Sequence, residues 1–177
     1  MATISDILSA EHFDILKVIE ALEKETAKLA ESRKINHDFF QKALDFIKNY
    51  ADGFHHAKEE EILFREFCKN EAQMHCNPIE QMLAEHDLGR KYVKQLAAGL
   101  ADNRADEIMA GARGYADLLK EHIFKEDNIL YPMAEEGLSA EIKAEILNQF
   151  SQLAETKYNP EFIGRYAELI KELAANQ

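Results

Sequence analysis

The sequence has very little of the residues that break helices or cross-link a chain. Its 177 residues include no tryptophan, three prolines, seven glycines and two cysteines. The scarcity of proline and glycine argues against a sheet-rich or disordered chain and favours an all-helical one. Two cysteines, Cys68 and Cys76, are too few for a disulfide framework. Reduced thiols are the expected state, and a regulatory disulfide between the two is the alternative.

Long apolar runs and an excess of positive charge are also missing. No segment is long and apolar enough to span a bilayer, and the N-terminal residues carry acids where a signal peptide would be apolar. The formal net charge of −12 argues against nucleic acid or an anionic membrane as a partner. We therefore expect a cytoplasmic protein.

Apolar residues at three-to-four spacing dominate what is present. They predict four long helices over about 4–31, 38–69, 78–100 and 105–136, with Thr3 or Ser5 capping the first and Pro78 as the first residue of the third. Short links between these helices predict an all-α, up-down-up-down four-helix bundle.

Two shorter helices follow the predicted bundle. Ser139 is expected to cap a fifth helix that ends near Thr156, and a sixth covers about 161–174. The bundle is assigned to residues 1–136 and a C-terminal helical extension to 137–177. We expect the extension to pack on the bundle within a single domain.

Histidine and glutamate recur in a duplicated pattern. The stretches "HHAKEEEILF" from His55 and "HIFKEDNILY" from His122 agree at His, Lys-Glu, Ile-Leu and a final aromatic residue. Each places a glutamate four residues after a histidine, Glu59 and Glu126 respectively, and residues four apart share one face of a helix. One such pair is a weak motif, but the repetition in register strengthens it.

A second repeat lies upstream of each pair. The stretches "AEHFDILKVIEAL" and "AEHDLGRKYVKQL" carry His12 and His86, so the chain reads as two copies of one helical hairpin. Four histidines and two carboxylates that can bridge favour a dinuclear iron centre near the bundle axis, with manganese possible. Structural zinc fits less well, because it prefers four ligands and is usually bound by thiolates. The predicted ligands are His12, His55, Glu59, His86, His122 and Glu126.

These elements resemble the hemerythrin-like, or HHE cation-binding, family over residues 1–136. The resemblance implies a four-helix bundle with a non-haem di-iron centre that meets O2, NO or peroxide, and it supports the same six ligands with both glutamates bridging. Animal hemerythrins have a further histidine where this chain has Arg90. That difference makes the chain more similar to bacterial proteins linked to nitrosative stress and repair of iron centres. The family's aspartate has a counterpart in Asp127, but Glu126 is preferred because it repeats the register of Glu59.

The remaining histidines are expected to have other roles. His56 and Glu60 are also four apart, but a rotation of about 100° per residue turns them away from the predicted ligands. We therefore expect them to form a flanking pair, with a ligand role as the alternative. His37 is expected to be solvated at a helix start, and His75 to lie in a loop without function.

Some neighbours of the predicted centre allow two interpretations. Tyr115 is expected to pack in the core, with a hydrogen bond to a bound oxygen or a ligand role as the alternative. Gly111 and Gly114 either leave room for a channel or allow close helix contact. Arg90 either reaches solvent or lies beside the centre.

Three classes of function remain. The first is a di-iron protein that reacts with a small oxidant, in a stress response or in repair of iron centres. The second is reversible oxygen or NO binding, sensing or iron storage without turnover, so enzymatic activity stays open. The third, a purely structural bundle, is disfavoured because burying six such polar groups without a metal is costly. The Glu-x-x-His motif of ferritin-like di-iron bundles is missing.

Overall fold

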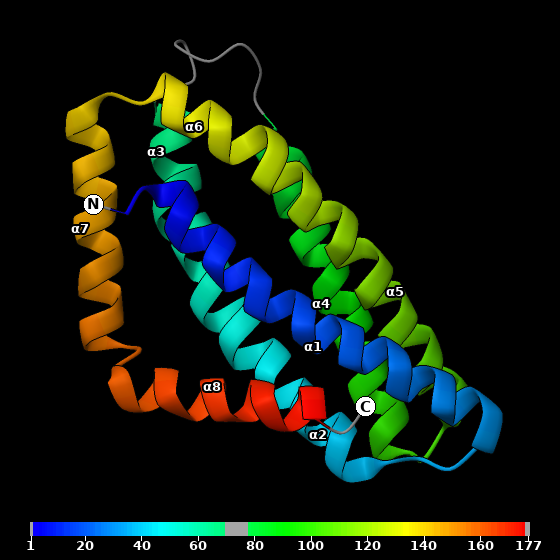
Figure 1. The fold of residues 1–177 in the computed structure, drawn as a ribbon. Helices are drawn as coiled ribbons and strands as arrows, with labels where there is room; N and C mark the ends of the chain where they lie inside the picture. Colours follow the sequence, from blue (N-terminus) through cyan, green and yellow to red (C-terminus); the bar gives the residue numbers. More distant parts are fainter. Residues whose placement is uncertain (1, 70–77, 176–177) are drawn as a thin grey trace.

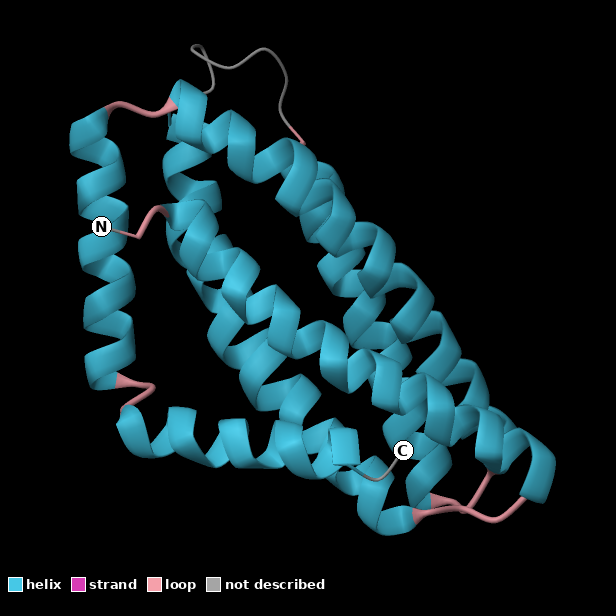
Figure 2. Cartoon of the chain, in the orientation of Figure 1, coloured by secondary structure: helices cyan, strands magenta, loops and turns pink. Residues whose placement is uncertain are grey.

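The protein is described by a computed structural model that places residues 2–69 and 78–175. Within these residues all regular structure is helical, which confirms the all-α prediction (Figure 2). None of the helices in the described part is both long and apolar enough to cross a membrane. The elements, in which η marks a π-helical segment, are α1 Ile4–Ser32, α2 His37–Phe46, η1 Ile47–His56, η2 Glu59–Leu63, α3 Phe64–Lys69, α4 Ile79–Ala101, α5 Ala105–Lys125, η4 Glu126–Leu130, α6 Tyr131–Gly137, α7 Ala140–Thr156 and α8 Pro160–Ala175.

Four long helical columns lie side by side in Figure 1. The first is α1, the second runs from α2 through η1 and η2 to α3, the third is α4, and the fourth runs from α5 through η4 to α6. We call the first two columns the first half of the bundle and the last two the second half. The predicted limits of all six helices agree with the structure to within one residue at each end.

Local capping explains where these helices begin. Thr3 caps α1 by accepting from the backbone N–H of Asp6, whose carboxylate accepts from the N–H of Thr3 in return. Ser139 caps α7 through its side chain, as predicted. Pro78 was expected as the first residue of α4. It occupies the N-cap position instead, and the helix begins at Ile79.

The π-helical segments were not predicted. They replace α-helix over Ile47–His56, Glu59–Leu63 and Glu126–Leu130, which lie within the second and fourth columns. A π-helix bonds each N–H to the carbonyl five residues earlier, so each residue turns through a smaller angle than in an α-helix. Side chains that are adjacent in sequence can therefore lie closer to one common face.

The apolar core has two parts with a polar layer between them. On α1, Leu8 and Ile15 belong to different apolar clusters, and buried His12 lies between them. On α4, His86 lies between the clusters in the same way. The polar layer is thus enclosed by apolar side chains from both ends of the bundle.

Helices α7 and α8 form an L-shaped cover on the side of the first half (Figure 1). Helix α8 packs against α1 and α2 and adds Tyr166, Ile170 and Leu173 to one apolar cluster. Helix α7 adds Ile146 and Phe150 to the other cluster. The extension therefore completes both parts of the core.

Glycines allow α4 and α5 to pack closely. A Cβ atom on Gly111 would lie 2.6 Å from the backbone nitrogen of Leu96, and one on Gly114 would lie 2.3 Å from the ring of Tyr92. Of the two predicted roles for these glycines, close helix contact is the one that the structure supports.

Replacing Gly111 with alanine should lower the free energy of unfolding by about 1–3 kcal/mol, because backbone atoms must move to admit the new methyl group. Gly164→Ala is the matched control. No atom lies within 4 Å of a Cβ at that position in α8, so alanine should be neutral or stabilise by up to about 1 kcal/mol. Chemical denaturation measures both changes, and equal effects would contradict the close contact.

Candidate metal centre

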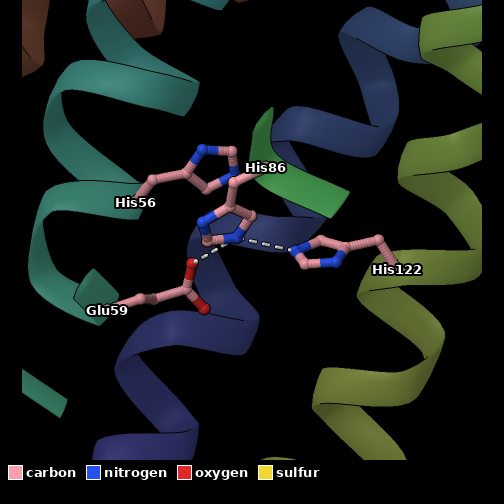
Figure 3. A group of neighbouring side chains, drawn as sticks. All are labelled: His56, Glu59, His86 and His122. Atoms are coloured by element: carbon pink, nitrogen blue, oxygen red, sulfur yellow. Dashed lines mark hydrogen bonds and ion pairs between the residues drawn. The ribbon is translucent and has the colours of Figure 1, made fainter. Parts of the chain in front are cut away.

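The polar layer contains two groups of donor atoms that share one carboxylate. The two-histidine group consists of His12, His55, Glu59 and Glu126, and the three-histidine group consists of His56, Glu59, His86 and His122. Within each group the donor atoms all lie within 4.8 Å of one another. Figure 3 shows how the three-histidine group converges from three helical columns. The structure thus brings all six predicted ligands together and adds His56.

Glu126 lies between histidines of both groups. Its Oε2 atom is 3.3 Å from Nε2 of His12, and its Oε1 atom is 3.1 Å from Nε2 of His122. The side chain is completely buried. One carboxylate with an oxygen toward each group has the arrangement needed to bridge two cations.

Glu59 has the equivalent position in the first half. Its Oε2 atom lies 3.6 Å from Nε2 of His55 and 3.5 Å from Nε2 of His86. Glu59 is also completely buried, so two carboxylates share one enclosed space.

Four buried atoms at this centre have no hydrogen-bond partner. They are Nε2 of His55, Oε2 of Glu59 and both carboxylate oxygens of Glu126. Each unsatisfied buried polar group costs about 1–3 kcal/mol, and more when it is charged. Cations between the two groups would satisfy all four atoms, and nitrogen and carboxylate donors in this ratio suit iron or manganese.

Every histidine of the centre is held by an acid at its other ring nitrogen. These contacts join Nδ1 of His12 to Asp127 at 2.9 Å, of His55 to Glu11 at 2.9 Å, of His56 to Asp52 at 3.2 Å, of His86 to Glu60 at 2.6 Å and of His122 to Glu85 at 2.8 Å. An acid at Nδ1 assigns the proton to that nitrogen and leaves the Nε2 lone pair free for a metal. The same contacts fix the orientation of each ring.

The outer acids explain the repeated Glu-His and Lys-Glu signals in the sequence. In the first half, Glu11 accepts hydrogen bonds from His55 and from the ammonium group of Lys58. In the second half, Glu85 has the same role, with Lys125 as its ammonium donor. The two upstream motifs therefore supply acids as well as histidines.

Two further contacts join one half to the other. Glu60 in the second column binds His86 on α4, and Asp127 in the fourth column binds His12 on α1. Asp127 also accepts from Ser9 Oγ at 2.6 Å. The preference for Glu126 over Asp127 as the inner carboxylate agrees with this geometry.

Sequence reasoning missed His56 as a member of the centre. The ring of His56 stacks on that of His86, with centroids 3.8 Å apart and planes at 12° (Figure 3). His55 and His56 both face inward because they end a π-helical segment, where the assumed rotation per residue does not hold. The expected pairing of His56 with Glu60 is wrong, since His56 binds Asp52. The available signal was Asp52, an acid four residues before His56.

Arg90 holds two of the outer acids. Its guanidinium donates to Asp52 and to Glu60, from Nε at 3.0 Å and from Nη2 at 2.6 Å. These are the acids that orient His56 and His86. Burial opposes ionisation of Asp52, but hydrogen bonds from His56 and Arg90 outweigh it and lower its pKa to about 2. Arg90 therefore contacts the centre indirectly, through Asp52 and Glu60. Of its two predicted positions, the one beside the centre agrees with these contacts.

The two inner carboxylates have opposite electrostatic environments. Burial and repulsion from Glu126 raise the pKa of Glu59 well above its usual value. Burial also disfavours ionised Glu126, but the nearby positive charges of His122 and His12 outweigh it and hold its pKa well below the usual value. Without cations, protons must therefore supply the positive charge that the centre needs.

A cavity of about 220 Å³ adjoins the three-histidine group. It is lined by all three histidines of that group, by buried Tyr115 and Leu119, and by exposed Lys48 and Lys94. An apolar cavity of roughly 150 Å³ holds benzene, so this one is more than large enough for a diatomic molecule. Tyr115 is buried, and its pKa is raised mainly by burial.

The other predicted positions lie away from the centre. His37 is exposed at the start of α2, as expected, and Cys68 is exposed with a free thiol. His75 and Cys76 lie outside the described residues, so the regulatory disulfide stays a prediction.

The fold and the centre together define a metal-binding helical protein. Its family follows from a family model, described as the hemerythrin HHE cation binding domain, that matches residues 3–134. The chain belongs to this family. Searches of curated proteins and of solved structures found no match. The family match ends near the end of α6 and leaves α7 and α8 outside it.

Metal-free protein should lose stability as the pH rises from about 6.5 to about 9. Burial disfavours charged His12, but the hydrogen bond that it donates to Asp127 and the nearby carboxylate of Glu126 outweigh burial and raise its pKa from 6.5 to about 9. The folded protein therefore keeps a proton that the unfolded chain releases, and the stabilisation, up to roughly 3 kcal/mol, is complete below pH 6.5 and lost through pH 9.

Chemical denaturation across this pH range, with and without chelator, tests the effect. Metal-loaded protein should show the opposite trend, because ligands must lose protons to bind a cation. His12→Gln should abolish the alkaline loss, whereas His37→Gln, at an exposed position, should keep it. A metal-free protein whose stability rises over this range would contradict the assignment.

Proposed function

We propose that the four columns form an up-down-up-down bundle that holds two iron ions and binds or reacts with O2, NO or peroxide. The observation that carries the proposal is the set of four buried, unpartnered atoms inside two donor groups that share the carboxylate of Glu59. Membership of a cation-binding family supports it. Manganese remains chemically possible, since the same nitrogen and oxygen donors accept it.

The residues of the centre have separate roles in the proposed function. Nε2 atoms of five histidines would hold the ions, and Glu59 and Glu126 would bridge them and offset their charge. When bound, the iron pair supplies electrons to, or a binding position for, the small oxidant. The outer acids, two of which are held by Arg90, would fix the orientation of each imidazole and place a proton on Nδ1, so that Nε2 faces the ions.

The cavity is the proposed route for the small molecule. It ends at the three-histidine group and includes side chains that are exposed at the surface. Its apolar walls suit O2 and NO, which carry no charge. Helix α4 contributes Gly89 to the lining, and a Cβ atom there would make only ordinary contacts, the nearest at 3.6 Å from Tyr115.

Reversible binding, sensing or iron storage is the second candidate. The observation that favours it is the rigid support of the centre, where every histidine is fixed by an acid and both bridging carboxylates are completely buried. Such a rigid site is suited to hold an adduct. Stopped-flow spectra of the reduced protein with O2 and with NO separate the candidates, because a carrier gives a stable, reversible adduct and an enzyme gives turnover.

Protein isolated without chelator should contain two irons per chain. Glu59→Gln and Glu126→Gln should each remove at least one iron, because an amide keeps the size but supplies no negative charge and bridges poorly. Glu61→Gln is the matched control, since Glu61 is exposed on the same column and touches neither donor group. Plasma emission spectroscopy measures the content, and a single zinc, or no metal, would refute the di-iron proposal.

Filling the cavity should slow entry of the small molecule. Gly89→Leu places a branched side chain beside Tyr115 and should lower the rate of NO binding to the reduced protein several-fold while the iron content stays the same. Gly89→Ala is the control and should have little effect. Unchanged rates in both variants would show that the ligand enters elsewhere.

A further inference from the structure

The two halves differ at the aromatic residue that ends each repeated motif. In the first half this residue is Phe64, which stacks on the ring of His86 with centroids 5.8 Å apart and planes at 23°. In the second half it is Tyr131, which stacks on the ring of His12 with centroids 5.5 Å apart and planes at 14°. The two positions thus carry the same ring in the same setting, and they differ by one oxygen atom.

That oxygen lies among the donor atoms of the two-histidine group. The hydroxyl of Tyr131 donates to Oε1 of Glu59 at 2.5 Å and is 3.2 Å from Nε2 of His12. The tyrosine is completely buried, so its hydroxyl does not reach solvent. It is also an oxygen donor that the count of histidines and carboxylates leaves out.

The two groups have unequal numbers of histidines. The three-histidine group has three imidazoles, whereas the two-histidine group has only those of His12 and His55. Glu59 belongs to both groups, and Glu126 has one oxygen toward a histidine of each. With the hydroxyl of Tyr131, the two-histidine group would also have three donors besides the carboxylates. His56 and Tyr131 are the two donors that the repeated motifs do not share. Together they would give each of the two metal positions three donors besides the carboxylates.

We propose that Tyr131 is a ligand of the ion held by His12 and His55 and coordinates it as a phenolate. The inference rests on the proposed iron centre. The metal–oxygen bond replaces the O–H bond, and the proton leaves to solvent as the ion binds. Without an ion the hydroxyl stays protonated and donates to Glu59, as the structure shows.

A bound cation changes which form of the Tyr131 side chain the centre favours. In the metal-free structure the buried hydroxyl donates to Glu59 beside a second buried carboxylate, and this setting favours the neutral phenol. A bound cation reverses this balance, because it is the largest local charge and favours the anion. A hydroxyl that only orients Glu59 is the competing role, and it predicts a neutral phenol in the loaded protein.

Resonance Raman and visible spectra of the oxidised, iron-loaded protein distinguish these roles. An iron(III) phenolate gives a visible charge-transfer band and enhanced tyrosine ring modes, and ring-deuterated tyrosine should shift those modes. Tyr131→Phe should abolish the band while two irons remain bound, because phenylalanine already fills the equivalent position 64. Tyr115→Phe is the matched control, since it removes a buried phenol at the cavity, and it should keep the band.

Each outcome decides a different point. Iron-loaded wild-type protein without the band, or a band that survives Tyr131→Phe, would overturn the phenolate ligand and leave the di-iron centre intact. Absence of iron from the wild type would instead overturn the proposed function. If the Tyr131→Phe variant does not fold, loss of the band in Tyr115→Phe would still refute the proposal. If that variant does not fold, a band that is kept in Tyr115→Phe and that shows the isotope shift supports the phenolate ligand.

Discussion

The burial of Glu59 and Glu126 in one enclosed space is the constraint on which the rest of the structure depends. Two carboxylates without solvent repel each other and lose their hydration, which is costly unless opposite charge is supplied. The imidazoles of His12 and His122, whose pKa values are raised, can provide that charge as protonated rings, and the five rings together can instead recruit cations. The two apolar clusters above and below the layer exclude water and so make the demand for positive charge strict.

The outer acids meet a second demand, because a neutral imidazole coordinates only when its ring is correctly turned. Each ring is held at Nδ1. Four of the five acids are in turn held by Lys58, Lys125 and Arg90, and the fifth, Asp127, accepts from Ser9. Acidic and basic groups therefore alternate outward from the centre. An inner carboxylate is followed by an imidazole, the imidazole by an outer acid, and four of the outer acids by a lysine or arginine. The chain's many acids are partly explained by this arrangement, since the acids at the centre serve as ligands and supports.

Much of this could be predicted from the sequence. Helix limits followed from apolar spacing and caps, and the six residues from the two repeats were predicted to converge, as they do. His56 could not be predicted in the same way, because a rule of 100° per residue describes an α-helix and this residue ends a π-helical segment. The role of Arg90 could not be decided from the sequence for a related reason. Its partners, Asp52 and Glu60, are close to it only after the halves pack, and no local pattern records that contact.

The contacts of the outer acids also bear on how such a centre can arise. Glu11 supports a histidine within its own half, whereas Glu60 and Asp127 each support a histidine of the other half. Each hairpin alone therefore lacks the acid that supports one of its histidines. Two identical hairpins related by a two-fold axis would supply every one of these contacts, as in an isologous dimer. The present chain has the form of such a dimer joined into one polypeptide, in which equivalent positions need not be the same, as Phe64 and Tyr131 or His56 and Ile123 are not.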